Sequence, residues 1–448
     1  MPVPKRPTIG PIRSWQFPLP EQFTLANGME VRLYQLPGRQ LISANLVLDL
    51  PLNAEPEGIS GLATMAVRVA DEGTFNHPGV SFAEALEDLG AEYGGNADES
   101  STVLGIVAPA TRLESALLLF AELVMQPEIA GDDVARHLAL RHAELEQAKM
   151  QSPALASRAF RELVFSPDSR AFQPVAGDES SLERITPENL RHFHQLNWVP
   201  SHATLVLAGE LPSGIRSWVE TAFNGWTGEK QTVYLPAEPS TDSPRILLYD
   251  RPGAVQTDLR IGSFSVDRKH PDWAALQVAG TAIGGSFGSR LNARLREDLG
   301  YTYGAGAHFT PRQVHGVFSI STSVRTEVTI PAISEILQLL DIQDRPITTQ
   351  ERTDAINYLV GVAPVQYDTA IPIARQASAI ASTKMPVTWV NDLHRLISEV
   401  TPEQATAAFQ ARVKASEQFI ALSGDAAVLE NQLATLGLPY TVLDPRTA

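Results

Sequence analysis

The organisation of this chain follows from the stretch ITPENLRHFHQLNWVPSHATLVLAGEL, residues 185–211, which recurs in outline as VTPEQATAAFQARVKASEQFIALSGDA at residues 400–426. Each copy begins with a threonine that can cap a helix, followed by a proline that suits the first helical turn. Each then runs through a helix into a short apolar strand. Thr401 lies 215 positions after Thr186, so the sequence predicts an internal repeat.

A second pair of segments supports the repeat. ALEDLGAEYGG at residues 85–95 is similar to LREDLGYTYGAG at residues 295–306, and the two EDLG tetrapeptides lie 210 positions apart. Both predict a helix end, a glycine stop and a strand start. Because the two matches occur in the same order at nearly one offset, we expect two homologous halves. Strands and helical runs mix in each half, which predicts an α+β fold with an antiparallel or mixed sheet and helices packed on one face.

The length of 448 residues is too great for one ordinary core. The sequence predicts an extended N-terminal arm over residues 1–20, an N-terminal domain over 21–226, a polar and proline-rich linker over 227–244, and a C-terminal domain over 245–448. In the first half, helices are expected over 60–71, 81–89, 110–125, 131–163 and 186–197.

Composition limits the classes of function. The chain has 51 acidic and 35 basic residues and a net charge of −16. This balance disfavours nucleic acid, which a protein binds through a basic face, and it favours basic peptides weakly. Cysteine is absent, so disulfides and thiolate metal sites are excluded. We find no signal peptide and no membrane-spanning run of apolar residues, and we therefore expect a cytoplasmic protein.

The stretch GISGLATMAVRVADEGT, residues 58–74, joins a glycine-rich turn to a helical apolar stripe. With the Asn27-Gly28 turn and the motifs GAEYGGNADESST, FQPVAGDESSLERITPENL, LVLAGEL and LREDLGYTYGAG, it resembles the insulinase/pitrilysin family of inverted zinc metallopeptidases. The resemblance covers roughly residues 20–435 and includes small processing-peptidase-like bacterial members. It implies two halves that face each other around a chamber, as in a clamshell.

The resemblance also shows where the catalytic signature of the family, H-x-x-E-H followed about 75 residues later by a glutamate, would fall. Aligned on Gly61, its two histidines fall on Thr64 and Arg68, its general base on Val67 and its distant ligand on Glu144. A lone carboxylate cannot hold zinc, an arginine repels a dication, and a valine accepts no proton. We therefore expect no metal and no catalytic residue at these positions, and zinc on a partner subunit.

The second half keeps a different feature of the family, an arginine and a tyrosine seven residues apart that contact substrate. Here they are Arg296 and Tyr303. Their donors suit a peptide carbonyl or a developing oxyanion. Strand alternation would place Tyr301 on the same face as Tyr303. By itself, the pattern favours a solvated ion pair for the arginine and half-buried packing for the tyrosine. In the first half, Asn96 lies on the strand that resembles the peptide-binding edge strand of the family.

Three hypotheses of function follow. The first is a subunit without zinc in a heterodimeric metallopeptidase, inactive alone, which contributes Arg296 and Tyr303 to peptide bound at the zinc of an H-x-x-E-H partner. The second is a purely structural or peptide-binding pseudo-peptidase subunit of a larger complex. The third, a standalone hydrolase, needs a relocated metal site. Against that site, we expect the helix histidines to be solvated; they are His137, His142, His192 and His194.

Overall fold

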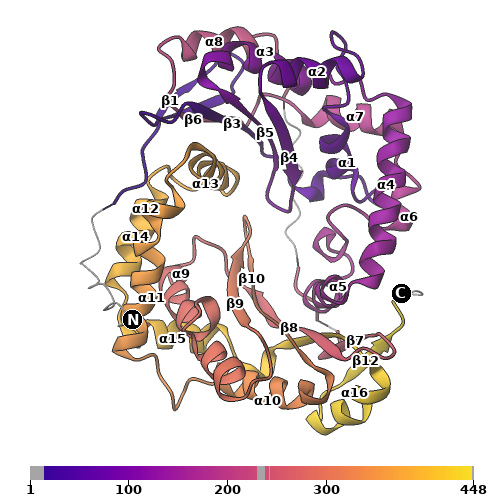
Figure 1. The fold of residues 1–448 in the computed structure, drawn as a ribbon, viewed down its shortest axis with the longest axis vertical. Coiled ribbons are helices and arrows are strands. Elements are labelled where there is room, and N and C mark those ends of the chain that lie inside the picture. The colour runs from indigo at the N-terminus through magenta and orange to yellow at the C-terminus, as the bar shows by residue number, and fades with distance from the viewer. Residues whose placement is uncertain (1–14, 230–237, 242, 446–448) are drawn as a thin grey trace, which may run out of the picture.

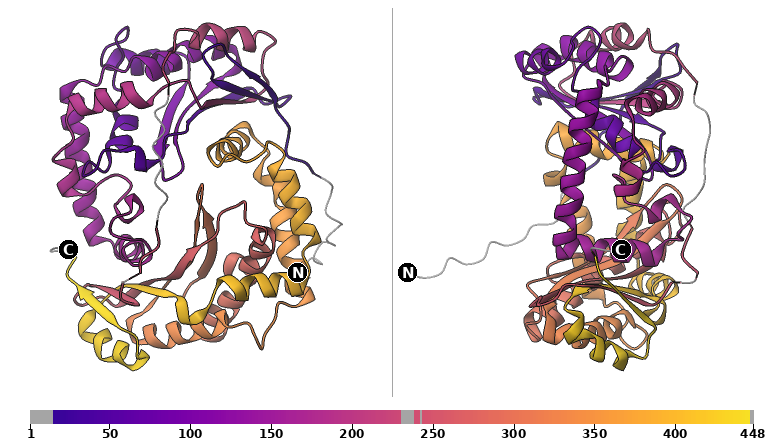
Figure 2. Two further views of the ribbon diagram at one scale, coloured as in Figure 1. Left: turned by 180° about the vertical axis from the view of Figure 1, so that it is seen from behind. Right: turned by 90° about the vertical axis from the view of Figure 1, so that its right-hand side faces the viewer.

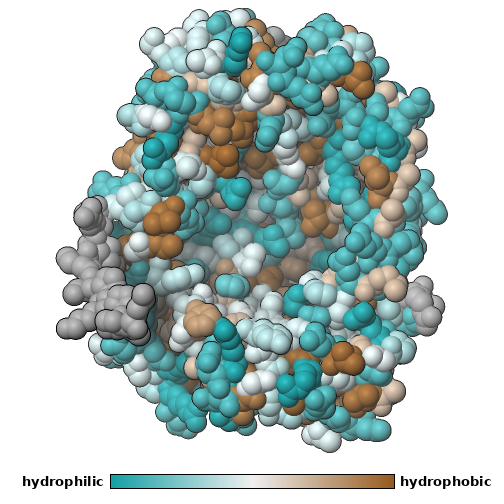
Figure 3. All heavy atoms as spheres, in the orientation of Figure 1, coloured by the Kyte–Doolittle hydropathy of each residue, from teal (hydrophilic) through white to brown (hydrophobic). Residues whose placement is uncertain are grey.

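The computed structural model describes residues 15–229, 238–241 and 243–445. Each half of the chain builds one six-stranded sheet, and the two sheets face each other across a hollow at the centre of the molecule (Figures 1 and 3). Residues 1–14 of the expected arm lie outside the described residues, as do 230–237 and 242 of the expected linker. The two-half α+β fold is confirmed.

The N-terminal sheet has the order β1-β2-β6-β3-β5-β4, and the C-terminal sheet has the order β12-β7-β11-β8-β10-β9. The strands of the first are β1 (Glu21–Thr24), β2 (Glu30–Gln35), β3 (Leu41–Leu48), β4 (Glu92–Ala97), β5 (Thr102–Pro109) and β6 (Ala203–Gly209). Those of the second are β7 (Ile246–Asp250), β8 (Gln256–Ser265), β9 (Ala305–Pro311), β10 (Gly316–Arg325), β11 (Phe419–Gly424) and β12 (Tyr440–Leu443).

The two sheets are copies of each other except at one edge. The series β2-β6-β3-β5-β4 corresponds strand by strand to β7-β11-β8-β10-β9, including the parallel pairs β2–β6 and β7–β11. The outermost strands differ, because β1 runs antiparallel to β2 whereas β12 runs parallel to β7. The repeat in the sequence is thus a repeat of topology.

Helices cover the outer face of each sheet (Figure 1). On the first sheet they are chiefly α1 (Leu62–Val69), α2 (Val80–Asp88), α3 (Leu113–Met125), α7 (Pro187–Asn197) and α8 (Ile215–Phe223). On the second they are chiefly α9 (Trp273–Gly280), α10 (Thr329–Leu340), α11 (Thr349–Gly361), α14 (Trp389–Glu399), α15 (Pro402–Arg412) and α16 (Ala426–Leu433). Among the described residues, no helix is both long and apolar enough to cross a membrane.

The repeated caps have the predicted roles. Thr186 and Thr401 each form a capping box, with Asn189 and Gln404 as the reciprocal partners. Gly90 and Gly300, the glycines of the two EDLG segments, have φ angles of 61° and 60°. Such left-handed backbone favours glycine, which explains why both helices stop at this residue.

One long helix in the expectation is two helices in the structure. The segment 131–163 forms α4 (Gly131–Met150) and α5 (Ser152–Val164), which are separated by Gln151 in extended conformation. Pro153 lies two positions later and disfavours helical backbone before it. The break lets α5 leave the N-terminal half.

Each half lends one helix to the inner face of the opposite sheet, an exchange that the sequence did not predict. Helix α5 packs on the C-terminal sheet, where Leu155 and Leu163 contact Tyr249. Helix α13 (Ala370–Ser382) packs on the N-terminal sheet, where its apolar face meets Val206 and Tyr34. The halves are therefore joined on both sides of the central hollow (Figures 1 and 2).

The described part of the N-terminal arm is extended and crosses to the C-terminal half. The ring of Trp15 stacks on Tyr367 at 5.4 Å between centroids. The backbone of Phe17 exchanges two hydrogen bonds with the side chain of Asn391, at 2.8 and 3.0 Å. These contacts add a third connection between the halves.

Candidate functional site

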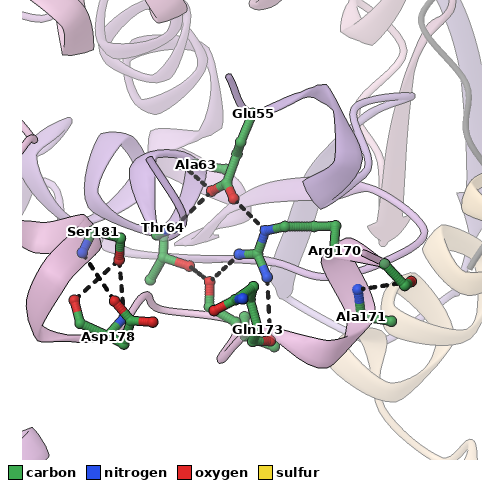
Figure 4. Close-up of polar contacts among 11 residues, drawn as sticks. Glu55, Ala63, Thr64, Arg170, Ala171, Gln173, Asp178 and Ser181 are labelled. Atoms are coloured by element: carbon green, nitrogen blue, oxygen red, sulfur yellow. Dashed lines mark hydrogen bonds and ion pairs between the residues drawn. The ribbon is translucent and has the colours of Figure 1, made fainter. Parts of the chain in front are cut away.

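The helix that carries positions 64, 67 and 68 is held at its N-terminal end by a buried carboxylate. Glu55 accepts hydrogen bonds from the backbone N–H groups of Gly61 at 3.2 Å and Ala63 at 2.8 Å (Figure 4). Its other oxygen accepts from Nε of Arg170 at 2.6 Å. The side chain of Glu55 is 1% exposed, and burial raises its pKa against the opposing effect of Arg170 and the two N–H donors.

The hydroxyl of Thr64 is used by the loop that faces α1. It donates to the carbonyl of Val175 at 3.3 Å, and Nη2 of Arg170 donates to the same carbonyl at 3.0 Å (Figure 4). The first family metal position therefore helps to fix a loop.

The second and third metal positions form a salt bridge with each other. Arg68 donates to both carboxylate oxygens of Glu144, at 2.9 and 3.0 Å, in a bidentate arrangement that joins α1 to α4. Arg141 donates to the same carboxylate at 3.1 Å. The hydrogen bond from Arg68 is the main influence that lowers the pKa of Glu144. The one remaining acidic ligand is thus neutralised by two guanidinium groups.

Val67, at the position of the general base, is a packing residue. Its side chain is buried at 4% exposure and lies against β4, where a Cβ atom added to Gly95 would come within 2.7 Å of it. The hydroxyl of Tyr93 donates to the backbone carbonyl of Val67 at 3.1 Å. Helix α1 and β4 are therefore in close contact where the family keeps an open zinc site.

These residues do not fit a zinc ion. The carboxylate of Glu144 is bound by the guanidinium groups of Arg68 and Arg141. The hydroxyl of Thr64 donates to a backbone carbonyl, and the valine at position 67 is a buried apolar side chain. Within the described ranges, no three histidine, aspartate or glutamate side chains are grouped to hold a metal elsewhere. The expectation of solvated histidines is wrong for two residues, because Nε2 of His137 lies 2.5 Å from Glu72 and His194 is buried against the carbonyl of Val124.

The C-terminal half presents its arginine differently. Arg296 lies in the π-helical segment η5 (Asn292–Asp298), a rare conformation that is frequent at functional sites. Its guanidinium carbon is 4.4 Å from the ring centre of Phe287, whose side chain is 70% exposed. The nearest carboxylate partner is the adjacent Glu297, at 3.4 Å. The expected ion pair is present but weak, and the aromatic ring, which the sequence analysis missed, gives the arginine its direction.

Tyr303 is 94% exposed, so it is not a half-buried packing residue. It lies in a turn before β9, and the expectation that it shares a strand face with Tyr301 is wrong because β9 begins at Ala305. Tyr301 instead packs against the C-terminal core. The turn itself is fastened, since the hydroxyl of Thr322 donates to the hydroxyl of Thr302 and to the carbonyl of Gly304, both at 3.0 Å.

Buried Asn292 connects the two loops that carry Phe287 and Tyr303. Its Nδ2 donates to the carbonyl of Ser286 at 3.2 Å, and its Oδ1 accepts from the N–H of Ala305 at 2.9 Å. The glycine-rich stretch GGSFGSRLN places Asn292 five residues after Phe287, but only the fold shows that it bridges to β9. Asn292 thus joins the loop of Phe287, whose ring lies under Arg296, to the turn that holds Tyr303, and these three residues are here called the Arg/Tyr surface.

Asn96 lies on β4, which ends the N-terminal sheet and, within the described residues, pairs only with β5. It is exposed and lines a cavity in the central hollow together with Gly94 and Gly95. The structure thus places Asn96 on an open sheet edge in one half and the Arg/Tyr surface at the start of β9 in the other.

Comparison with known proteins agrees with this architecture. The family model for insulinase (peptidase family M16) matches residues 38–167, and that for the peptidase M16 inactive domain matches residues 184–359. An uncharacterized zinc protease of Rickettsia bellii is 23% identical over 305 residues, 67% of this chain and 72% of that protein.

Two solved structures share the fold. One is the peptidase M16 inactive domain from Pseudomonas fluorescens, with a TM-score of 0.84 at 24% identity, covering 91% of this chain and 98% of that one. The other is a protease from Helicobacter pylori, with a TM-score of 0.79 at 17% identity, covering 91% and 100%. The chain therefore belongs to the insulinase family, peptidase family M16, and lacks its zinc-binding motif.

Proposed function

We propose that this chain is the subunit without zinc in a heterodimeric peptidase of the insulinase family. The partner carries H-x-x-E-H and the metal, and this chain supplies Arg296 and Tyr303 to the peptide that is cut there. Two features support the proposal. The residues at the metal positions of the family form contacts within the fold, and in the Arg/Tyr surface Phe287 and Tyr303 are exposed while Arg296 is half-buried.

The observation that carries the proposal is Tyr303. An aromatic side chain that is 94% exposed is a poor packing residue, yet four contacts of its neighbours fix the turn that holds it. Tyrosine and arginine are residue types that are enriched in binding hot spots. The hydroxyl of Tyr303 is free to donate to a peptide oxygen, which is the role that a fixed donor fills during acyl transfer.

The test is reconstitution with an H-x-x-E-H member of the family from the same organism, copurified with this chain. We expect chelator-sensitive cleavage of peptide by the complex and none by this chain alone. Tyr303→Phe removes one donor and should lower kcat by roughly 10- to 100-fold. Tyr358→Phe, which removes the hydroxyl of another exposed tyrosine on α11, is the matched control and should change nothing.

The alternative is a purely structural or peptide-binding subunit. It predicts that Tyr303→Phe and Tyr358→Phe behave alike in every assay of cleavage. An unchanged rate for the first variant in an active complex would therefore favour the alternative.

A further inference from the structure

A cavity of about 560 Å³ lies in the central hollow between the N-terminal sheet and α13. Its floor is formed by β3, β4 and β5, and its wall by α13 of the other half. The helix covers β3 and β6 but leaves β4 and β5 open. The cavity therefore exists because the exchanged helix is narrower than the sheet it covers.

The floor of the cavity is lowest where two glycines meet. Gly105 on β5 pairs with Gly94 on β4 and with Asn45 on β3, so the three residues form one row across the sheet. Leu104 and Ile106, which flank Gly105, are fully buried in the core on the opposite face. A Cβ atom at Gly94 would meet no atom within 4 Å, so a ligand side chain can enter a recess at Gly94, whereas Oδ1 of Asn45 lies 2.7 Å from where a Cβ atom of Gly105 would be and covers that glycine.

The recess borders a free sheet edge. Because β4 pairs on one side only in the part of the chain that the structure describes, alternate backbone N–H and C=O groups along its outer side can pair with an extended peptide. Side chains of paired residues on adjacent strands point to the same face. A peptide residue opposite Gly94 would therefore direct its side chain over the recess.

Arg375 is the one basic residue among the described residues that line this cavity. It is exposed, and no carboxylate within the described part of the chain forms an ion pair with it. It lies one helical turn before Ser378, whose hydroxyl accepts a hydrogen bond from Asn45 at 3.2 Å. This contact fixes α13 over the glycine row and places Arg375 beside it.

The two acidic residues of the lining belong to the ends of β4. Glu92 is its first residue, and Asp98 follows its last. The carboxylate of Asp98 accepts from the N–H groups of Ser100 and Ser101, at 2.7 and 3.0 Å, and so is used by the turn. Of the charged residues in the described lining, Asp98 is thus bound by its own turn, and Glu92 and Arg375 remain.

We infer that this cavity is a subsite for a carboxylate side chain of an extended peptide that pairs with β4, and that Arg375 selects it. The inference rests on the proposed function, because it assumes that peptide reaches the hollow. The chain as a whole carries a charge of −16 and does not attract acidic peptides at long range. Selection of a carboxylate thus requires a local, unpaired guanidinium, which can bind it in a bidentate manner.

The experiment measures peptide binding to the isolated chain by fluorescence anisotropy. The probes are three labelled decapeptides of alternating valine and serine with one central glutamate, glutamine or lysine. We expect the glutamate peptide to bind about tenfold more tightly than the glutamine peptide, as one charge-assisted pair predicts. Arg375→Gln should remove this preference, and Arg375→Glu should transfer it to the lysine peptide.

Two further variants separate the recess from general charge. Gly94→Val places a side chain in the recess, where a Cβ atom meets no neighbour within 4 Å, and should also remove the preference for glutamate. Arg395→Gln removes an exposed arginine of α14 outside the cavity and should leave the preference intact. Equal binding of the glutamate and glutamine peptides by the unmodified chain would overturn the inference. So would a preference that survives Arg375→Gln, or binding of none of the three peptides.

Failure of this inference is distinct from failure of the proposed function, because binding is measured without the partner. If the complex cleaves peptide in a Tyr303-dependent manner while the isolated chain shows no preference for glutamate, only the subsite is wrong. If the preference is found but the complex does not cleave, the subsite stands and the peptidase role is wrong.

Discussion

The two halves of this molecule share a topology, but the arginine at the candidate site of each half has a different environment. In the N-terminal half, Arg68 is paired with both oxygens of Glu144 between two helices. In the C-terminal half, Arg296 lies over the exposed ring of Phe287, and the adjacent Glu297, at 3.4 Å, is its only ion-pair partner in the described part of the chain. Arg68 neutralises a carboxylate within the fold, whereas the donors of Arg296 are available to another molecule.

The difference shows how a carboxylate at a metal position of the family is stabilised without a metal. Such a carboxylate needs a positive charge nearby, and Arg68 and Arg141 supply it. The site thereby becomes part of the scaffold. Changes in the N-terminal site should therefore alter stability, and changes in the Arg/Tyr surface should alter activity.

The largest effect on stability is expected from Glu55→Ala. It removes the buried partner of Arg170 and the acceptor for two N–H groups at the start of α1. Loss of one member of a buried ion pair costs about 3 kcal/mol or more in the free energy of unfolding. Urea denaturation of the isolated chain would measure it. Glu55→Gln keeps an acceptor oxygen and should cost clearly less; an equal loss for both variants would show that charge, and not hydrogen bonding, holds the helix.

A smaller effect is expected from Glu144→Gln, with a defined pH dependence. The pKa of Glu144 is lowered from its usual 4.5, so the folded state favours the ionised form. The stabilisation is therefore complete above pH 4.5 and is lost as the pH falls through the lower folded pKa. Because the side chain is 42% exposed, solvent screening limits its contribution to about 1 kcal/mol.

The measurement compares the free energy of unfolding of the two proteins at pH 7 and near pH 3. The difference should be largest at pH 7 and smaller near pH 3, which is below the usual pKa of 4.5. A difference that is constant with pH would mean that the Arg68–Glu144 pair does not contribute through its charge.

Most of the fold could be predicted from local signals in the sequence. Thr186, Thr401, Gly90 and Gly300 mark helix ends through backbone chemistry that depends on a few neighbouring residues, and all four have the expected roles. The absence of the H-x-x-E-H motif from α1 could also be predicted, because three residues at fixed spacing are a local feature. Pro153 was equally local, but the apolar periodicity on both sides of it concealed the break at Gln151.

Contacts between distant segments were not predictable from one sequence. The exchange of α5 and α13 depends on which sheet each helix meets after folding, and Arg375 gains its position only through that exchange. Asn292 bridges Ser286 and Ala305 across a loop and a strand, and nothing in its immediate sequence specifies the second partner. These residues define the surfaces on which function is proposed.

The smallest effect is expected from Phe287→Leu, and it tests the C-terminal side of the comparison. The ring of Phe287 directs Arg296, and an exposed cation–π contact is worth about 0.5–1 kcal/mol. We expect kcat/KM of the reconstituted complex to fall about threefold, as this energy predicts, while the free energy of unfolding stays within about 0.5 kcal/mol because the side chain is 70% exposed. Phe75→Leu, at a phenylalanine of the other half that is 71% exposed, is the matched control and should leave kcat/KM unchanged.

In an Arg296→Ala background, Phe287→Leu should have no further effect, because the ring acts through the arginine. If the two substitutions instead reduce kcat/KM independently, Phe287 contacts the peptide itself, and the C-terminal half uses its aromatic ring as well as its arginine for binding.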